Sequence, residues 1–164
     1  MPPPPTRCLI LACGNTLRGD DGVGPWLAQW AEKRFASDHA VRVLWCQQWT
    51  PELAEEIAAA ASVLFIDCSV DSLPGQVTLA PIAPATTSTG LATHHLGAPE
   101  LLALARELFH ASPSSAQLLT IGAASVELSE NLSPTVSAVL PQACQLLVSC
   151  LRTPPQTFKE LSSH

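Results

Sequence analysis

Charged side chains are scarce in this sequence. They make up 13% of its 164 residues, where about 25% is typical of a globular domain. This shortage excludes a disordered polyelectrolyte and a long charged coiled coil. Basic residues are the rarer sign, because eight Lys and Arg stand against fourteen Asp and Glu, for a formal net charge of −6. Such a chain has no basic surface for a phosphate backbone, so we expect no nucleic-acid partner.

Long apolar runs are also missing. None approaches the roughly 18 residues that cross a bilayer, and the opening Met-Pro-Pro-Pro-Pro lacks the basic and apolar regions of a secretion signal. We therefore expect a cytoplasmic protein with no membrane insertion. The six cysteines fit a reducing compartment, since none forms a CxxC pair. We predict no disulfide framework and no zinc–thiolate site, and interpret these cysteines as small, mostly buried apolar side chains.

Several catalytic signatures are absent. The sequence contains no GxxxxGK[ST] phosphate-binding loop, no GxSxG nucleophile elbow and no HExxH zinc helix. The segment 14–19 lacks the GxGxxG spacing, and two acids beside it would repel a pyrophosphate. There is no tyrosine, which excludes a short-chain dehydrogenase that depends on one. The common nucleotide-binding and serine-hydrolase classes are thereby removed.

What is present is an alternation of strand-like and helix-like segments. Apolar runs at 8–13, 41–46, 62–67 and 117–122 predict strands buried on both faces, and helical spacing occurs at 23–31, 51–60, 96–108 and 134–151. Strands separated by such helices form βαβ units. The sequence therefore predicts an α/β fold, a single three-layer αβα sandwich with a mostly parallel, twisted sheet. Pro74-Gly75 followed by the alternating segment 76–79 predicts an added strand, antiparallel at an edge.

The domain organisation follows from the same pattern. Residues 1–6 are expected to form a flexible Pro-rich arm, 7–152 a single α/β domain, and 153–164 a flexible C-terminal tail. Residues 83–93 have the composition of a loop.

Candidate functional residues stand where strands end. Asp20 and Asp21 follow the first strand, and Asp67 ends the third, so parallel strands would carry them to one edge of the sheet. His94 and His95 follow the polar loop and could reach the same edge. Two carboxylates and an imidazole suit a divalent first-row metal with open positions for water or substrate. Such a metal would lower the pKa of bound water and polarise a carbonyl, which is hydrolytic chemistry.

Each of these positions also has a structural interpretation. The Asp pair could cap the helix that follows it and interact with the helix dipole. Asp67 could be a turn residue, and the His pair could be exposed polar side chains. If Asp20 only caps a helix, Asp20→Ala should reduce activity less than Asp21→Ala does.

Four segments in order resemble the hydrogenase maturation proteases, endopeptidases that remove the C-terminal extension of the NiFe hydrogenase large subunit. The resemblance covers about 8–152. The segment 14–24, Gly-Asn-Thr-Leu-Arg-Gly-Asp-Asp-Gly-Val-Gly, is similar to the family's G-N-x-L-x-x-D-D/E-G-x-G. The other three segments are Asp67 with the later Pro74-Gly75, then Thr93-His94-His95-Leu96, then Leu132-Ser133-Pro134.

The resemblance implies a function and a site. Residue by residue, the family's metal-binding triad falls on Asp21, Asp67 and His94, which would also be the catalytic residues. The metal implied is nickel, carried by the hydrogenase large-subunit precursor rather than held permanently by the protease. Contact with that nickel would place one peptide bond against the site. A carboxylate or a metal-polarised water would then attack the scissile carbonyl, and which of them is the nucleophile stays open.

The sequence departs from the family's pattern in places, and other functions are compatible with it. Asp21 stands where some relatives carry Glu, Cys68 replaces a common Ala, and His95 competes with His94 as the ligand. A nickel-binding assembly factor that docks the precursor without cutting is one alternative function. A general metallohydrolase holding its own ion is another. A monomer is expected, although Trp45 and Trp49 could lie in the core or at an interface.

Overall fold

The computed structural model describes residues 5–86 and 96–152. The elements follow the order β1 (Cys8–Cys13), the 3-10 helix η1 (Gly19–Gly22), α1 (Val23–Arg34), β2 (Val41–Cys46), α2 (Leu53–Ala58), β3 (Ser62–Ser69), β4 (Val77–Pro81), α3 (Ala98–Phe109), β5 (Ser115–Gly122) and α4 (Pro134–Arg152). Most of the predicted segments are found within two or three residues of their expected bounds. The helix expected at 51–60 is shorter, and the strand expected at 117–122 begins earlier.

One sheet holds the five strands in the order β2-β1-β3-β5-β4. The first four are parallel, and β4 runs antiparallel to β5 at the edge. This confirms the mostly parallel sheet and the added edge strand. Because β1 and β3 are neighbours and parallel, their carboxyl ends lie at the same edge of the sheet.

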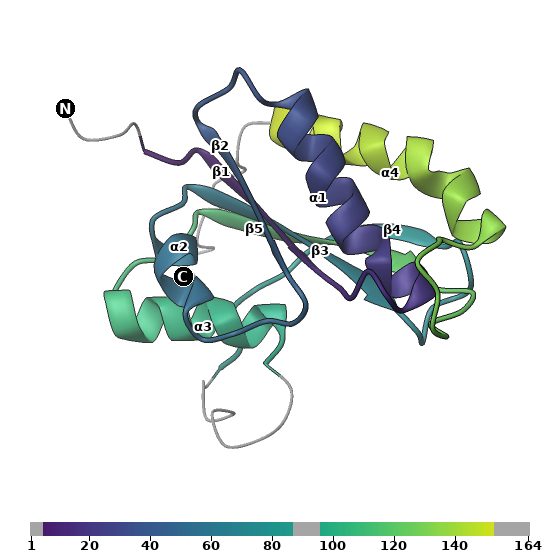
Figure 1. The fold of residues 1–164 in the computed structure, drawn as a ribbon. Coiled ribbons are helices and arrows are strands. Elements are labelled where there is room, and N and C mark those ends of the chain that lie inside the picture. The colour runs from purple at the N-terminus through teal and green to yellow at the C-terminus, as the bar shows by residue number, and fades with distance from the viewer. Residues whose placement is uncertain (1–4, 87–95, 153–164) are drawn as a thin grey trace, which may run out of the picture.

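Helices cover both faces of the sheet, as Figure 1 shows: α1 and α4 lie on one face, α2 and α3 on the other. The side chains of β1 alternate between the two apolar cores that result. Ile10 and Ala12 contact the core beneath α1 and α4, while Leu9 and Leu11 contact the core beneath α2 and α3. This alternation explains why β1 reads as a continuous apolar run. The predicted three-layer sandwich is confirmed.

A serine side chain caps the start of α4. The backbone N–H of Val136 donates to the hydroxyl of Ser133 over 3.2 Å, and Pro134 is the first helical residue. Among the described residues, α4 is the one helix long and apolar enough to cross a membrane by length and composition. Its side chains Val136, Ala143 and Leu147 are nevertheless fully buried in the core beneath α1 and α4. In this structure α4 is a layer of the sandwich.

The cysteines and two of the tryptophans differ in how far they are buried. All six cysteines are free and are buried or half-buried. Trp49 packs edge-on against Phe65, with ring centroids 5.6 Å apart, so it belongs to the core beneath α2 and α3. Trp45 is 41% exposed.

Candidate active site

The two predicted carboxylates of Asp21 and Asp67 come together at the carboxyl edge of the sheet. Asp21 lies in η1, which follows β1, and Asp67 lies near the end of β3. The 3-10 helix η1 contacts β3 directly. The electrostatic field of Asp21 acts on the Asp67 carboxyl. Residues 46 positions apart in sequence therefore share one site, as the parallel arrangement predicts.

Asp67 is the more perturbed of the two acids. Its side chain is half-buried, and its Oδ1 accepts a hydrogen bond from the N–H of Cys68 over 2.8 Å. Burial raises the pKa of Asp67 to about 6, against the lowering effect of the Cys68 N–H and with a further rise from the Asp21 charge. An acid of this kind exchanges a proton close to neutral pH, as a general base or acid must.

Asp21 is held by the loop that precedes it. The backbone N–H of Asn15 donates to Asp21 Oδ2 over 2.8 Å, and the Asp21 side chain is half-buried. The N–H of Leu17 in turn donates to the Asn15 side-chain oxygen over 2.9 Å. The Gly-Asn start of the motif thus fixes the direction of one Asp21 oxygen.

Two glycines of the motif are required by close backbone approach. A Cβ at Gly14, which has φ +155°, would lie 1.9 Å from the carbonyl oxygen of Asp21. A Cβ at Gly24 would lie 2.3 Å from the carbonyl oxygen of Cys13. The turn after β1 is therefore folded so tightly that Asp21 lies directly over the end of the strand.

Asp20 does not cap the helix that follows it, which corrects the capping interpretation of the Asp pair. The residue before α1 is Gly22, and no side chain caps that helix. Asp20 is instead fully buried and bonded to a distant loop. Its carboxylate accepts hydrogen bonds from the N–H groups of Ala124 (2.8 Å), Ser125 (3.1 Å) and Ser133 (2.7 Å) and from the Ser133 hydroxyl (2.9 Å).

Through these hydrogen bonds, Asp20 connects η1 to the start of α4. Burial raises the pKa of Asp20, but the hydrogen bonds from Ser133, Ser125 and Ala124 outweigh burial and hold the pKa of this carboxyl below its usual range. Gly19 adds a backbone bond to Ser129 over 2.8 Å. The adjacent acids thus differ: Asp20 holds the site together, and Asp21 faces it.

Sequence reasoning missed the neighbours of Asp67 within the sheet. Thr120 is its register partner on β5. On the other side, the register of β1 and β3 ends at Ala12 and Ile66, so Cys13 and Asp67 are the next residues of these two strands. Cys13 is also the register partner of Cys46 on β2. Alternation puts these side chains on the face that α2 and α3 cover. These neighbours follow from the strand register, which the sequence alone does not specify.

The third predicted site residue, His94, lies outside the described residues, as does His95. Within 5–86 and 96–152, no group of three His, Cys, Asp or Glu side chains is arranged to hold a metal ion. The described part of the chain therefore supplies two carboxylates, and the ligand role of His94 stays a prediction.

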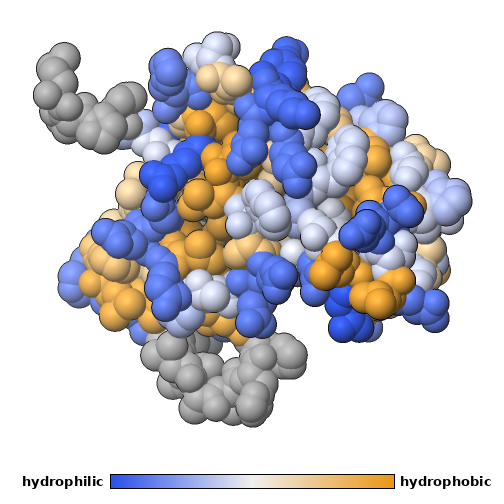
Figure 2. All heavy atoms as spheres, viewed as in Figure 1, coloured by the Kyte–Doolittle hydropathy of each residue, from blue (hydrophilic) through white to orange (hydrophobic). Residues whose placement is uncertain are grey.

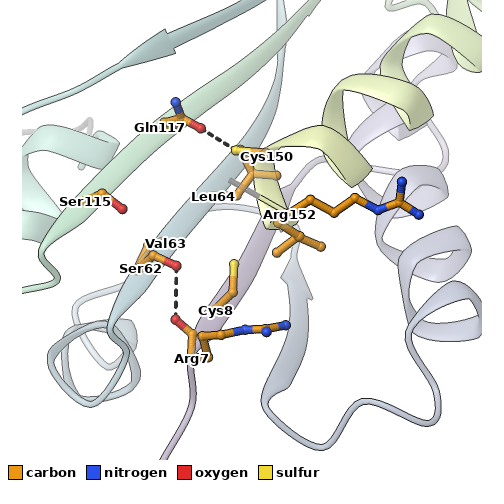
Figure 3. A pocket seen from close by; sticks show the side chains of 10 residues that line it. Arg7, Cys8, Ser62, Val63, Leu64, Ser115, Gln117, Cys150 and Arg152 are labelled. Atoms are coloured by element: carbon orange, nitrogen blue, oxygen red, sulfur yellow. Dashed lines mark hydrogen bonds between the residues drawn. The ribbon is translucent and has the colours of Figure 1, made fainter. Parts of the chain in front are cut away.

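A separate cavity lies at the opposite, amino-terminal edge of the sheet (Figure 3). It has a volume of about 290 Å³ and lies between the last turn of α4 and the starts of β1, β3 and β5. Arg7 and Arg152 stand at its mouth, and Arg7 is already paired with Asp38 at 2.8 Å. This cavity includes neither Asp21 nor Asp67.

Comparison with known proteins gives the fold a clear set of relatives. No protein-family model and no curated protein matches the chain. Among solved structures, the hydrogenase maturating endopeptidase HybD from E. coli is 23% identical, with a TM-score of 0.65 over 89% of this chain and 92% of that one. The HycI maturation protease from Thermococcus kodakarensis is 24% identical, with a TM-score of 0.68 over 90% and 94%.

A third structure extends the likeness. The hydrogenase 2 maturation peptidase from Thaumarchaeota archaeon SCGC_AB-539-E09 is 25% identical, with a TM-score of 0.65 over 88% of this chain and 97% of that one. The chain thus has the fold of hydrogenase maturation endopeptidases over almost its whole described length. The resemblance that the sequence motifs indicated is confirmed at the level of structure.

Proposed function

We propose that this protein is an endopeptidase that removes the C-terminal extension of a NiFe hydrogenase large-subunit precursor. The observation that carries the proposal is the meeting of Asp21 and Asp67 at the carboxyl edge of a sheet whose fold is shared with hydrogenase maturation endopeptidases. The ordered motifs of the sequence support the same function. The protein would be a cytoplasmic monomer with no membrane insertion.

The two acids would divide the work of hydrolysis. Asp67, with a pKa of about 6, is mostly ionised at neutral pH and can accept the proton of a water that attacks the scissile carbonyl. It can then return that proton to the departing peptide nitrogen as the C–N bond breaks. Asp21, oriented by the Asn15 N–H, would hold the reacting groups of the substrate in place.

Nickel enters this proposal as part of the substrate. Asp21 and Asp67 offer carboxylate oxygens, and His94 would add an imidazole nitrogen, a mixed set that suits a divalent first-row metal with open positions. A precursor that presents nickel would be gripped by these side chains, and one without nickel would not. The metal would thereby position the peptide bond to be cut, and the protease would select precursors that already carry nickel.

The surface around the carboxylates fits a protein substrate. Leu17 is 49% exposed and Leu128 is 88% exposed. Their segments are joined, because the N–H of Ser129 donates to the Leu17 carbonyl over 2.9 Å. Figure 2 shows apolar side chains at the surface at this end of the molecule. We assign this pair to contact with the folded precursor, since exposed apolar groups beside a site favour association.

The test uses a nickel-loaded large-subunit precursor and the same precursor prepared without nickel. The proposal predicts that only the loaded precursor loses mass, by the amount of one C-terminal peptide. A stable complex with unchanged precursor length would instead indicate a non-cutting assembly factor. Nickel or another metal retained in stoichiometric amount by the purified protein after dialysis would favour a general metallohydrolase.

A further inference from the structure

Two thiols lie side by side next to the carboxylate site. Cys13 ends β1 and Cys46 ends β2, and the two are register partners on adjacent parallel strands. Neighbouring strands are about 4.8 Å apart, which lies within the Cα separation of about 4.4–6.8 Å that a disulfide spans. Both positions continue the alternation that brings Leu11 and Leu44 to the core beneath α2 and α3, so both side chains point to the same face.

Hydrogen bonds of the two thiols join the end of β1 to the end of β2. The Cys13 thiol donates to the Gln47 carbonyl over 3.4 Å, and the Cys46 thiol donates to the Ala12 carbonyl over 3.8 Å. Cys46 is half-buried and so more accessible than Cys13, which is 8% exposed. The more accessible thiol would therefore meet a peroxide first, and its resolving partner is adjacent.

We propose that Cys13 and Cys46 form an oxidisable dithiol that closes to a disulfide when a peroxide reaches the site. The Cys46 thiolate would attack the peroxide O–O bond, forming a sulfenic acid and releasing water or an alcohol. The Cys13 sulfur would then displace hydroxide from that sulfenic sulfur, its proton leaving with the hydroxide as water. The two thiols are oxidised by two electrons in all, and the peroxide is reduced by the same two.

This bond would disturb the carboxylate site. The N–H of Gly14 donates to the carbonyl of Cys46 over 3.0 Å, and the next residue, Asn15, holds Asp21. Cys13 and Asp67 are the residues that follow the last register pair of β1 and β3, Ala12 and Ile66, and the charge of Asp67 acts on the Cys13 thiol. Oxidation would then move the backbone of Gly14 and Asn15, which positions Asp21, and reduction would restore it.

The other cysteines provide the controls. Cys68 belongs to the core beneath α1 and α4, on the opposite face of the sheet from Cys13 and Cys46. Cys150 lies at the amino-terminal edge, beside Gln117, in the cavity of Figure 3. A Cys150→Ser variant therefore removes one thiol without touching the proposed pair.

The first experiment tests the bond itself and does not depend on the proposed function. The full chain is treated with hydrogen peroxide and digested without reductant, and linked peptides are identified by mass. We expect a peptide pair joining Cys13 to Cys46, formed in wild type and Cys150→Ser and absent in Cys46→Ser. No such linkage, or a linkage through Cys68 instead, would overturn the proposal.

The second experiment follows the consequence for the site. Amide NMR shifts of Asn15 and Asp21 should change on oxidation of wild type, return with dithiothreitol, and stay constant in Cys46→Ser. Precursor processing, which alone rests on the proposed function, should fall by about 100-fold on oxidation and recover on reduction, as expected for a displaced catalytic group. Formation of the disulfide with unchanged amide shifts would refute the effect on the site.

Discussion

At the scale of single residues, Asp20 and Asp21 show how neighbours can take opposite roles. Asp20 is fully buried and accepts four hydrogen bonds from residues 124–133, whereas Asp21 is half-buried and accepts one from Asn15. Nothing in their identity separates them, because both are aspartates in one turn. Their difference comes from what the rest of the chain brings to each.

We predict that Asp20→Ala lowers the free energy of unfolding by about 3 kcal/mol or more. The substitution leaves the N–H groups of Ala124, Ser125 and Ser133 without their acceptor, and each unsatisfied buried donor costs about 1–3 kcal/mol. Asp21→Ala, the matched control, removes one such bond and should cost about 1 kcal/mol while abolishing processing. Urea unfolding of both variants measures the difference, and equal losses would contradict the role of Asp20 in holding η1 to the start of α4.

The ionised Asp67 carboxylate should lower the free energy of unfolding at neutral pH. Its pKa rises from 3.8 to about 6 on folding, so the native state holds the proton more tightly than the unfolded state. The stability gained with that proton is fully present below about pH 4 and is lost as the pH rises through 6. Asp67→Asn cannot ionise and should be more stable than wild type at pH 7, by up to about 3 kcal/mol.

The measurement is the free energy of unfolding of wild type and Asp67→Asn between pH 4 and pH 8. The gap between them should open as the pH rises and close toward pH 4. A gap that is constant with pH would mean that Asp67 is not perturbed by burial.

Some of these residue roles could be predicted from the sequence and others could not. The positions of Asp21 and Asp67 follow from strand ends and a parallel sheet, which local patterns reveal. The role of Asp20 depends on partners more than 100 positions later in the chain, and no local pattern announces such a bond. Thr120 and Cys13 as neighbours of Asp67 depend on strand register, which side-chain alternation alone leaves undetermined.

At the scale of elements, the first βα unit determines where the site forms. β1 is fully buried, and α1 begins so close to it that Gly24 approaches the Cys13 carbonyl. The strand, turn and helix are therefore closely packed, and together they position Asp21. The turn after β1 also contains Gly14, where a side chain would collide with the backbone of Asp21. The sequence of this turn is therefore constrained by backbone packing as well as by the chemistry of the site.

We predict that Gly24→Ala is destabilising by about 1–3 kcal/mol, because its Cβ would lie 2.3 Å from a backbone oxygen that cannot move away. Gly97→Ala is the control, since its Cβ would meet the end of the Glu100 side chain, which can rotate. That variant should lose less than about 1 kcal/mol. Thermal unfolding compares the two, and the same loss in both would contradict the close packing of α1 on β1.

The elements themselves were largely predictable. Buried parallel strands appear as apolar runs, and the Pro-Gly turn correctly placed β4 at the edge. The ends were less predictable, as at α2, which spans only Leu53–Ala58. Helix ends depend on which backbone groups find partners in the folded chain, and those partners are not local.

At the scale of the whole molecule, the sandwich separates two ends. The carboxyl edge of the sheet carries Asp21, Asp67 and the exposed Leu17 and Leu128, while the cavity of about 290 Å³ lies at the amino edge. The sheet order β2-β1-β3 is what makes the first of these a site. The sequence predicted this convergence for two acids, but the place of His94 lies outside the described residues.

The exposed leucines allow a test of client docking. Leu128→Asp should leave the melting temperature within about 1 °C of wild type, because a side chain that is 88% exposed contributes little to folding. It should raise KM for the precursor several-fold with kcat nearly unchanged, as expected when only uniform binding is lost. Leu108→Asp, at an exposed leucine of α3, is the control and should leave KM unaltered. Similar KM values for both variants would argue against docking at Leu128.

The most direct measurement of the central claim is a double-mutant cycle on processing of the nickel-loaded precursor by Asp21→Asn, Asp67→Asn and the double variant. If the two carboxylates act as one unit, each single variant should lose nearly all activity and the double variant should be no slower than the slower single. Circular dichroism would establish that all three are folded. Wild-type rates in either single variant, or losses that simply multiply in the double, would contradict a shared site.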